Sequence, residues 1–239
     1  MPPRPLRVIN FNVRRLSRHE LTRARRIGAF LGELGADICA LQEIEHPHES
    51  ISPLAEIARV AGMEHRTFTN HAPSHSRGVA ILHRNVPLAR SGARLPARRG
   101  DDKGYTRLVV EASADRPIEI IAVHLDPFSR HARLRQIADL AGNLEEPRMP
   151  RLVLGDLNAM TVAAWMKGKD HDETTDVLAE KLGVKAPIGR SPRTFPSVHP
   201  LFAIDWILAS PDLEFRSVRA VPTRLSDHAA LVAELDLRA

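Results

Sequence analysis

Short apolar segments and helical patterns alternate along the whole chain. Residues 6–11 are rich in residues that favour strands, and they predict a strand that ends at Asn12. Residues 20–34 carry apolar side chains at helical spacing, and Gly35 marks the end of the predicted helix. The same patterns predict further helices over residues 52–61 and 130–144, and further strands over residues 37–42, 65–69, 78–83, 105–112, 118–125, 151–154, 203–209, 214–221 and 229–237.

The order of these elements favours two mixed β-sheets over one parallel sheet. Regular alternation of strands and helices is typical of a parallel α/β sheet. Here, however, no crossover helix separates strands 65–69 and 78–83, and no glycine-rich phosphate-binding motif follows the first strand. No repeat or linker divides the chain, and residues 159–193 look like one or two surface helices and a loop. We therefore expect one α/β domain over residues 1–239, with two mixed sheets face to face and helices outside.

Polar residues that can do chemistry repeatedly follow the apolar strands. Because strand ends meet along a common rim, we expect these side chains to converge, although they are spread over most of the chain. They are Asn12, Glu43, His124, Asp156, Asn158, Asp205, Asp227 and His228.

The sharpest local signal is the segment from Gly155 to Asn158. Gly155 allows a tight turn after the strand, so that the Asp156 carboxylate and the Asn158 amide point the same way. A carboxylate can orient or deprotonate a water molecule, and an amide can donate to a phosphate oxygen. A plain turn, in which Asp and Asn cap backbone groups, would use the same residues.

A buried acid and a histidine form the second signal. Asp205 lies inside an apolar strand, where a carboxylate is costly to bury unless it is paired. His228, which follows Asp227, is a suitable partner, because such pairing fixes the tautomer of the imidazole and raises its basicity. We predict an Asp205–His228 dyad.

Two more polar residues end strands and suit phosphate chemistry. Glu43 could hold Mg²⁺, which prefers oxygen ligands and needs only one or two carboxylates. His124 could donate a hydrogen bond to a phosphate oxygen, although an ordinary half-buried histidine would look the same.

Composition limits the remaining possibilities. The single cysteine, Cys39, excludes a disulfide framework and a multi-cysteine metal site. No apolar run could span a membrane, and the first residues lack the apolar stretch of a signal peptide, so we expect a soluble, cytoplasmic protein. The formal charge of +5 and the arginine clusters in residues 4–26 and 90–107 could steer a polyanion, or could simply form a solvated surface. The low aromatic content, 4%, argues against a platform that stacks bases.

Seven short motifs, taken in order, resemble the endonuclease/exonuclease/phosphatase superfamily, the pancreatic deoxyribonuclease-like metal-dependent phosphoesterases. They extend over nearly the whole chain, at residues 9–13, 41–43, 78–82, 123–125, 155–158, 204–207 and 226–228. The resemblance implies a four-layer α/β/β/α sandwich and a Mg²⁺-assisted hydrolysis without a covalent intermediate, with Mn²⁺ as a possible substitute.

The resemblance also implies a role for each residue at the rim. Glu43, Asn12 and Asp227 match the metal ligands. Asp156 and Asn158 match the water-orienting acid and the phosphate-binding amide. The catalytic histidine, the acid that orients it and the phosphate-binding histidine correspond to His228, Asp205 and His124. Whether Asp156 or His228 is the formal base stays open at this stage.

The chain departs from the family pattern at several positions, and these departures indicate which subgroups of the family it resembles less. Arg14 stands where apurinic-site endonucleases and tyrosyl-DNA phosphodiesterases have an acid, and no glutamate near Gly78 could orient His124. The loop of residues 194–197 looks like one in uncharacterised bacterial members and should shape the pocket wall. Arg107 is a candidate for an extra phosphate contact or for a structural ion pair.

These features predict a Mg²⁺-dependent phosphodiesterase, with nucleic acid slightly favoured as the substrate by the positive charge. A sphingomyelinase-type lipid phosphodiesterase or an inositol-type phosphatase is the alternative among enzymes. Against the lipid substrate, the sequence shows no aromatic hairpin or amphipathic helix suited to a membrane surface. An inactive binding module on the same scaffold is the alternative outside enzymes, and no obligate protein partner is evident.

Overall fold

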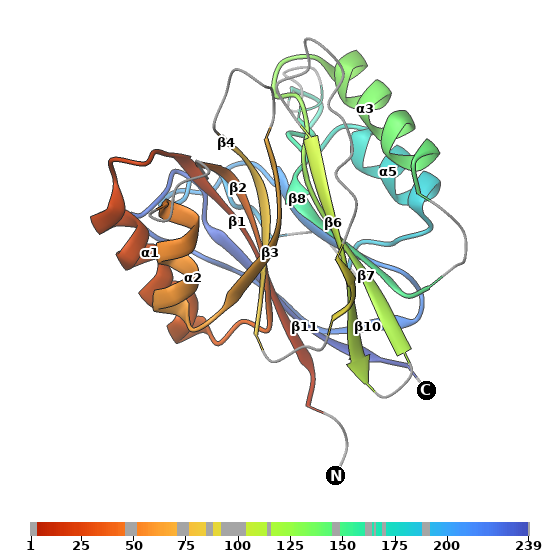
Figure 1. The fold of residues 1–239 in the computed structure, drawn as a ribbon. Helices are drawn as coiled ribbons and strands as arrows, with labels where there is room; N and C mark the ends of the chain where they lie inside the picture. The colour runs from red at the N-terminus through yellow and green to blue at the C-terminus, as the bar shows by residue number, and fades with distance from the viewer. Residues whose placement is uncertain are drawn as a thin grey trace.

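The structure of the chain is a computed structural model, shown in Figure 1. It describes residues 4–45, 52–70, 77–84, 88–91, 104–113, 116–144, 149–160, 164, 166–168, 171–187 and 192–238. Most of the arginine-rich segment over residues 90–107 and parts of the segment over residues 159–193 lie outside the described residues.

The strands form two mixed sheets. The first has the order β10-β11-β1-β2-β4-β3 and the second the order β5-β6-β7-β8-β9. Strands β1 and β2 are parallel, as are β7 and β8, and the other neighbours are antiparallel. The strand bounds are β1 Leu6–Leu16, β2 Ile38–Glu45, β3 Glu64–Asn70, β4 Arg77–His83, β5 Leu88–Ser91, β6 Gly104–Ser113, β7 Arg116–His124, β8 Arg151–Asp156, β9 Asp205–Ala209, β10 Leu213–Val221 and β11 Ala230–Leu237.

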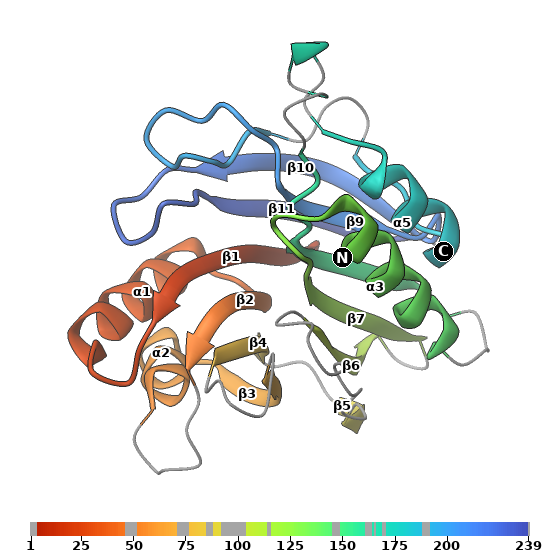
Figure 2. The same cartoon turned by 90° about the horizontal axis from the view of Figure 1, so that it is seen from above.

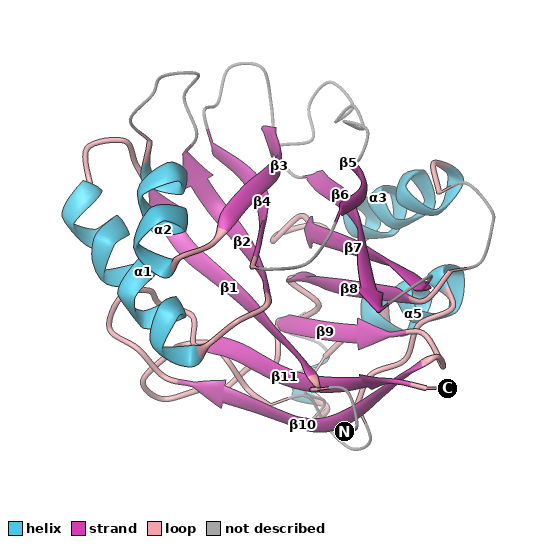
Figure 3. Cartoon of the chain, turned by 60° about the horizontal axis from the view of Figure 1, so that its bottom comes forward, coloured by secondary structure: helices cyan, strands magenta, loops and turns pink. Residues whose placement is uncertain are grey.

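Helices cover the outer faces of both sheets. They are α1 (Leu21–Leu34), α2 (Pro53–Ala61), α3 (Arg130–Gly142) and α5 (Thr174–Leu182). In Figure 2, α1 and α2 lie on one side of the strands and α3 and α5 on the other, and Figure 3 shows the strands between the two helix pairs. The four-layer α/β/β/α sandwich is confirmed. None of the described helices is both long and apolar enough to cross a bilayer.

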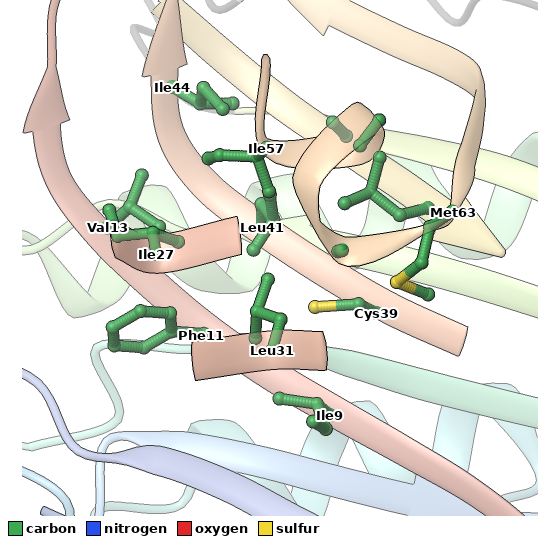
Figure 4. Packing of buried hydrophobic residues seen from close by; sticks show 14 of the residues in the cluster. Ile9, Phe11, Val13, Ile27, Leu31, Cys39, Leu41, Ile44, Ile57 and Met63 are labelled. Carbon is green, nitrogen blue, oxygen red and sulfur yellow. The ribbon is translucent and has the colours of Figure 1, made fainter. Parts of the chain in front are cut away.

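Three apolar layers hold the four layers of structure together. One lies between α1, α2 and the six-stranded sheet, where Figure 4 shows Phe11 and Leu41 packed near Ile27 and Leu31. The second lies between the two sheets and the third between the five-stranded sheet and its helices. Each sheet is therefore buried on both faces, which explains why the strands read as nearly continuous apolar runs.

Strand alternation decides which polar side chains enter the space between the sheets. On β1, Ile9, Phe11 and Val13 belong to the layer under the helices, whereas Val8 belongs to the layer between the sheets. Successive side chains of a strand point to opposite faces, so Asn10 and Asn12 share the inward side with Val8.

The five-stranded sheet follows the same rule at the same end. His124, Asp156 and Asp205 have the same inward parity as the apolar residues that precede them on β7 and β8 or follow them on β9. The layer between the sheets thus changes from apolar to polar at one end, and this polar end is where the predicted residues meet.

Gly155 has a different role from the turn predicted for it. It lies within β8, where a Cβ atom would collide with the carbonyl oxygen and the Cγ2 atom of Val123 on the neighbouring strand β7. The backbones therefore approach too closely at this point for any side chain, one residue before Asp156.

We predict that Gly155→Ala lowers the free energy of unfolding by about 2 kcal/mol, because a methyl group forces β7 and β8 apart. In a chain of this size that corresponds to a fall in Tm on the order of 5 °C. Gly142→Ala is the matched control, since a Cβ there meets nothing within 4 Å. Thermal melts of both variants by circular dichroism check the prediction, and a wild-type Tm for Gly155→Ala would contradict it.

Candidate active site

Three predicted residues stand side by side on the five-stranded sheet. His124 is the register partner of Asp156, and Asp156 is the register partner of Asp205. Because β9 runs antiparallel to β8, the start of β9 lies at the edge where β8 ends. Side chains at paired positions on one face lie about 5 Å apart, so these three form a single polar row.

The six-stranded sheet supplies donors that face this row. Asn12 Nδ2 donates to Asp156 Oδ2 (2.9 Å), and Asn10 Nδ2 donates to Asp205 Oδ1 (3.2 Å). Gln42 Nε2 in turn donates to Asn10 Oδ1 (2.8 Å), which fixes the orientation of that amide. Both carboxylates are thus held by side chains from the opposite sheet.

A β-bulge turns Glu43 towards the same row. Glu43 adopts φ of 60°, and the pairing of β2 with β4 shifts register between Gln42 and Ile44. Leu41 and Ile44 both pack under the helices, so the bulge reverses the alternation and directs Glu43 towards the site. Glu43 Oε1 then lies 3.9 Å from His124 Nε2.

The predicted dyad is present in the geometry. His228 Nδ1 lies 2.8 Å from Asp205 Oδ2, and Thr194 Oγ1 donates to the same oxygen (2.6 Å). Asp205 is 0% exposed. Its hydrogen bonds with His228, Thr194 and Asn10 compensate for the loss of hydration. The other ring nitrogen, His228 Nε2, lies 3.9 Å from Asp156 Oδ2.

Electrostatics favour a protonated His228. Burial alone would lower the pKa of this imidazole, but the charge of Asp205, the hydrogen bond to it and the charges of Asp156 and Asp227 raise that pKa to about 10. His228 therefore carries its proton at neutral pH in the metal-free protein. The ring of Phe195 packs against it, with centroids 5.0 Å apart.

Asp227 and Asn158 lie next to these groups but have partners of their own. Asp227 Oδ2 pairs with Arg14 Nε at 3.2 Å. Asn158 adopts φ of 47°, donates its side-chain amide to the Leu125 carbonyl (2.9 Å) and its backbone N–H to Asp156 Oδ1 (3.0 Å). In this conformation Asn158 stabilises the turn, which was the alternative to its phosphate-binding role.

Arg107 is engaged in an ion pair, so its phosphate contact stays a prediction without structural support. The Arg107 guanidinium forms an ion pair with Glu119, which also binds Arg151. Glu119 lies near the middle of β7, five residues before His124. The structural ion pair, the other possibility for this arginine, is what the chain forms.

Sequence reasoning did not assign a role to three residues that the site uses, Asn10, Gln42 and Thr194. The alternation of β1 and β2 could have found Asn10 and Gln42, since both are polar at inward positions of apolar strands. Nothing local marks Thr194 as a partner of Asp205, because the two meet only through the fold.

A cleft of about 690 Å³ lies beside the row, next to His228 and Glu43. Glu43, Asp227 and His228 contribute to its lining, together with arginines from β1, α1 and the segment between β10 and β11. The predicted metal ligands Glu43 and Asp227 therefore face one space, although they are far apart in the sequence.

A family model named Endonuclease/Exonuclease/phosphatase family matches residues 9–228. The chain belongs to this family. The first match among solved structures is a functionally unknown conserved protein from Enterococcus faecalis V583, with a TM-score of 0.77, 18% identity and coverage of 98% of this chain and 100% of that one. The human Nocturnin catalytic domain with bound sulfate has a TM-score of 0.73 and 21% identity, with coverage of 99% and 96%.

A mannosyl-6-phosphatase from Bacteroides thetaiotaomicron VPI-5482 also has this fold, with a TM-score of 0.69, 16% identity and coverage of 97% of this chain and 100% of that one. No curated protein matches the sequence. At these identities the structures establish the shared fold, and the family establishes the scaffold of a phosphoester hydrolase.

Family members generally depend on a divalent metal, and the site has suitable donors. Asp156, Asp205 and His228 place ligand atoms within 4.8 Å of one another. Asp205 and His228, however, are hydrogen-bonded to each other, so their near atoms are engaged. Glu43 and Asp156 lie 3.9 Å and 3.6 Å from His124 Nε2, and such oxygen donors suit a hard cation. The residues present therefore fit a divalent metal at the edge of the row.

We predict that, in EDTA, NMR titration of His228 gives a pKa near 10 and that Asp205→Asn lowers it, because the Coulombic attraction is lost. A folded-state pKa above the unfolded value of 6.5 means that the pair stabilises the fold fully below pH 6.5 and loses this contribution as pH rises through 10. The difference in unfolding free energy between the wild type and Asp205→Asn should shrink over that range. Titration of wild-type His228 near 6.5 would contradict the prediction.

Proposed function

We propose that this chain is a Mg²⁺-dependent phosphodiesterase that cleaves its substrate by in-line attack of an activated water. The observation that carries the proposal is the polar row, in which the Asp205–His228 dyad faces Asp156 across 3.9 Å. An imidazole held by one carboxylate and directed at a second suits water activation and charge stabilisation on one phosphate.

His228 and Asp156, which face each other, have different roles in the proposed reaction. Asp205 holds Nδ1 of His228, so Nε2 of the protonated ring is directed at Asp156. It can therefore donate to a phosphate oxygen as negative charge develops there. Asp156 is fixed by Asn12 and by the Asn158 backbone, and it orients the attacking water. We therefore propose that Asp156, rather than His228, is the general base.

Glu43, Asn12 and Asp227 are the proposed metal ligands, with Mn²⁺ as a possible substitute. When bound, Mg²⁺ would supply Lewis-acid stabilisation of charge on the phosphoryl group. The Arg15 backbone N–H donates to Glu43 Oε2 (3.0 Å) and leaves Oε1 directed at the row. His124, which lies between Glu43 and Asp156, would hold a phosphate oxygen. Asn158 would contribute only the second N–H of its side-chain amide, because the first is bound to the Leu125 carbonyl.

Nucleic acid is the favoured substrate class because of the charge around the site. The chain carries a formal charge of +5, and four arginines line the cleft beside His228. Positive charge at a cleft raises the local concentration of a polyanion. One protein that shares this fold is a phosphatase, so the substrate panel described below also includes a phosphate monoester.

A lipid phosphodiester is the second candidate, and exposed apolar side chains favour it. Phe128 is 94% exposed, and Met166, Val198 and Leu201 are also exposed. All four lie on segments that follow β7 and β8 or precede β9, at the end of the sheet that carries the polar row. The sequence has no recognisable aromatic hairpin for a membrane surface, but Phe128 is an exposed aromatic side chain on the loop after His124.

A panel of phosphoesters tests the proposed function. We expect hydrolysis of bis-p-nitrophenyl phosphate and of plasmid or oligonucleotide in Mg²⁺, and none in EDTA. His228→Ala should fold normally and lower kcat/KM by roughly 10²–10⁴-fold, because it removes the proton donor. Hydrolysis of sphingomyelin vesicles alone, or of p-nitrophenyl phosphate alone, would replace the nucleic-acid proposal. Near-normal turnover of His228→Ala would remove this residue from the mechanism.

Glu43→Gln tests the metal site. Loss of the carboxylate charge should raise the Mg²⁺ concentration needed for half-maximal activity by about tenfold or more, because charge dominates the affinity of an oxygen site. Glu33→Gln, an exposed position on α1, removes the same charge elsewhere and should leave the titration unchanged. Equal Mg²⁺ titrations for both variants would exclude Glu43 as a ligand.

A further inference from the structure

Four arginines contribute to the wall of the cleft. Arg14, Arg15, Arg23 and Arg224 line the cleft together with Glu20, Glu43 and Asp227. Arg23 pairs with Glu20 and Arg14 with Asp227. In the described part of the chain no carboxylate pairs with the guanidinium of Arg15 or Arg224, and both residues are exposed.

The backbone that carries Arg14 and Arg15 is strained. Both residues adopt the left-handed conformation, with φ of 48° and 47°, at a register shift between β1 and β2. Such values are rare for residues other than glycine. Every described non-glycine residue with positive φ lies at this site, the other two being Glu43 and Asn158.

A network of hydrogen bonds holds this strained segment in place. The Arg23 guanidinium, from α1, donates to the carbonyls of Val13 and Arg14 and also to the carbonyl of Leu225 (2.9 Å). It therefore joins the segment that carries Arg14 and Arg15 to the segment that carries Arg224. Ser226 Oγ adds a second link by donating to the Asn12 carbonyl (2.7 Å).

We propose that Arg15 and Arg224, with Arg14 beside them, form a second phosphate-binding subsite. It would hold a phosphate that flanks the one being cleaved, so the substrate is a strand with repeated phosphates rather than an isolated ester. A guanidinium matches a phosphate with two parallel hydrogen bonds. The cleft of about 690 Å³ is larger than one phosphate needs. The inference rests on the proposed function, because that function places the cleaved phosphate at His228.

In this arrangement Arg23 is a positioning residue. Although it lines the cleft, its guanidinium is engaged with backbone carbonyls on both segments, and it sets the spacing between the arginines that would contact the phosphate. Arg14 is engaged with Asp227, so Arg15 and Arg224 are the residues to replace.

The test compares a double variant, Arg15→Gln with Arg224→Gln, with a control double variant, Arg26→Gln with Arg135→Gln. The control arginines are exposed on α1 and α3, do not line the cleft and pair with no carboxylate in the described ranges, so both variants lose two charges. Tm and circular dichroism establish that both are folded. Binding of a fluorescein-labelled thymidine decamer is measured by anisotropy in EDTA at several KCl concentrations.

We expect the cleft double variant to bind the decamer about tenfold or more weakly, since each charged hydrogen bond contributes of order 1.5 kcal/mol. Its slope of log affinity against log salt should fall by about 1.4, the value for two contacts to a single strand. The kcat/KM for the decamer should fall at least about tenfold more than that for bis-p-nitrophenyl phosphate, which has no flanking phosphate. The control variant should match the wild type in all three measurements.

The outcomes separate the subsite from the proposed function. If the wild type hydrolyses diesters but the cleft and control variants behave alike, the subsite is overturned and the function stands. If the wild type hydrolyses no diester but the cleft variant loses decamer affinity and salt slope, the function fails and the subsite stands. Equal losses on the decamer and on bis-p-nitrophenyl phosphate would also overturn the subsite, because they place the arginines at the cleaved phosphate.

Discussion

The need to bury two carboxylates between the sheets governs the rest of this structure. Asp156 and Asp205 are 2% and 0% exposed, and charges so far from water require hydrogen-bond donors. Asn12 and Asn10 supply them from the opposite sheet. The two sheets are thus joined by apolar packing over most of their area and by directional hydrogen bonds at one end, and only the second kind of contact fixes their relative position closely.

This arrangement also explains how the loops are held. Thr194 and His228 reach Asp205 from two different segments, and the Thr194 carbonyl accepts the Ala229 backbone N–H (2.8 Å). Ser197 Oγ donates to the Thr223 carbonyl (2.7 Å) and accepts a hydrogen bond from the Thr223 backbone N–H (2.9 Å). The His228 imidazole is therefore fixed by the buried acid that needs it as a partner, so one set of contacts both stabilises the fold and orients the ring.

Much of this could be predicted from the sequence, because strand alternation is local. Apolar strands with polar ends indicated the sandwich and most of the row. Three features could not be predicted, since each depends on contacts between distant segments. The bulge that directs Glu43 has no glycine to mark it, and Gly155 is required by the neighbouring strand rather than by a turn. Arg107 is held by Glu119 near the middle of β7.

The antiparallel pairing of β8 with β9 has a consequence for how such a protein can diversify. The segment that leaves Asp156 and the segment that enters Asp205 emerge at the same edge, and the Leu157 backbone N–H donates to the Ile204 carbonyl (2.9 Å) just beyond the paired strands. Asn158 and Thr194, which hold the two carboxylates, lie on these same segments. A change in the length of the chain between Asn158 and Thr194 would therefore leave the hydrogen bonds to both carboxylates in place, and this stretch is where the surroundings of the site could diversify.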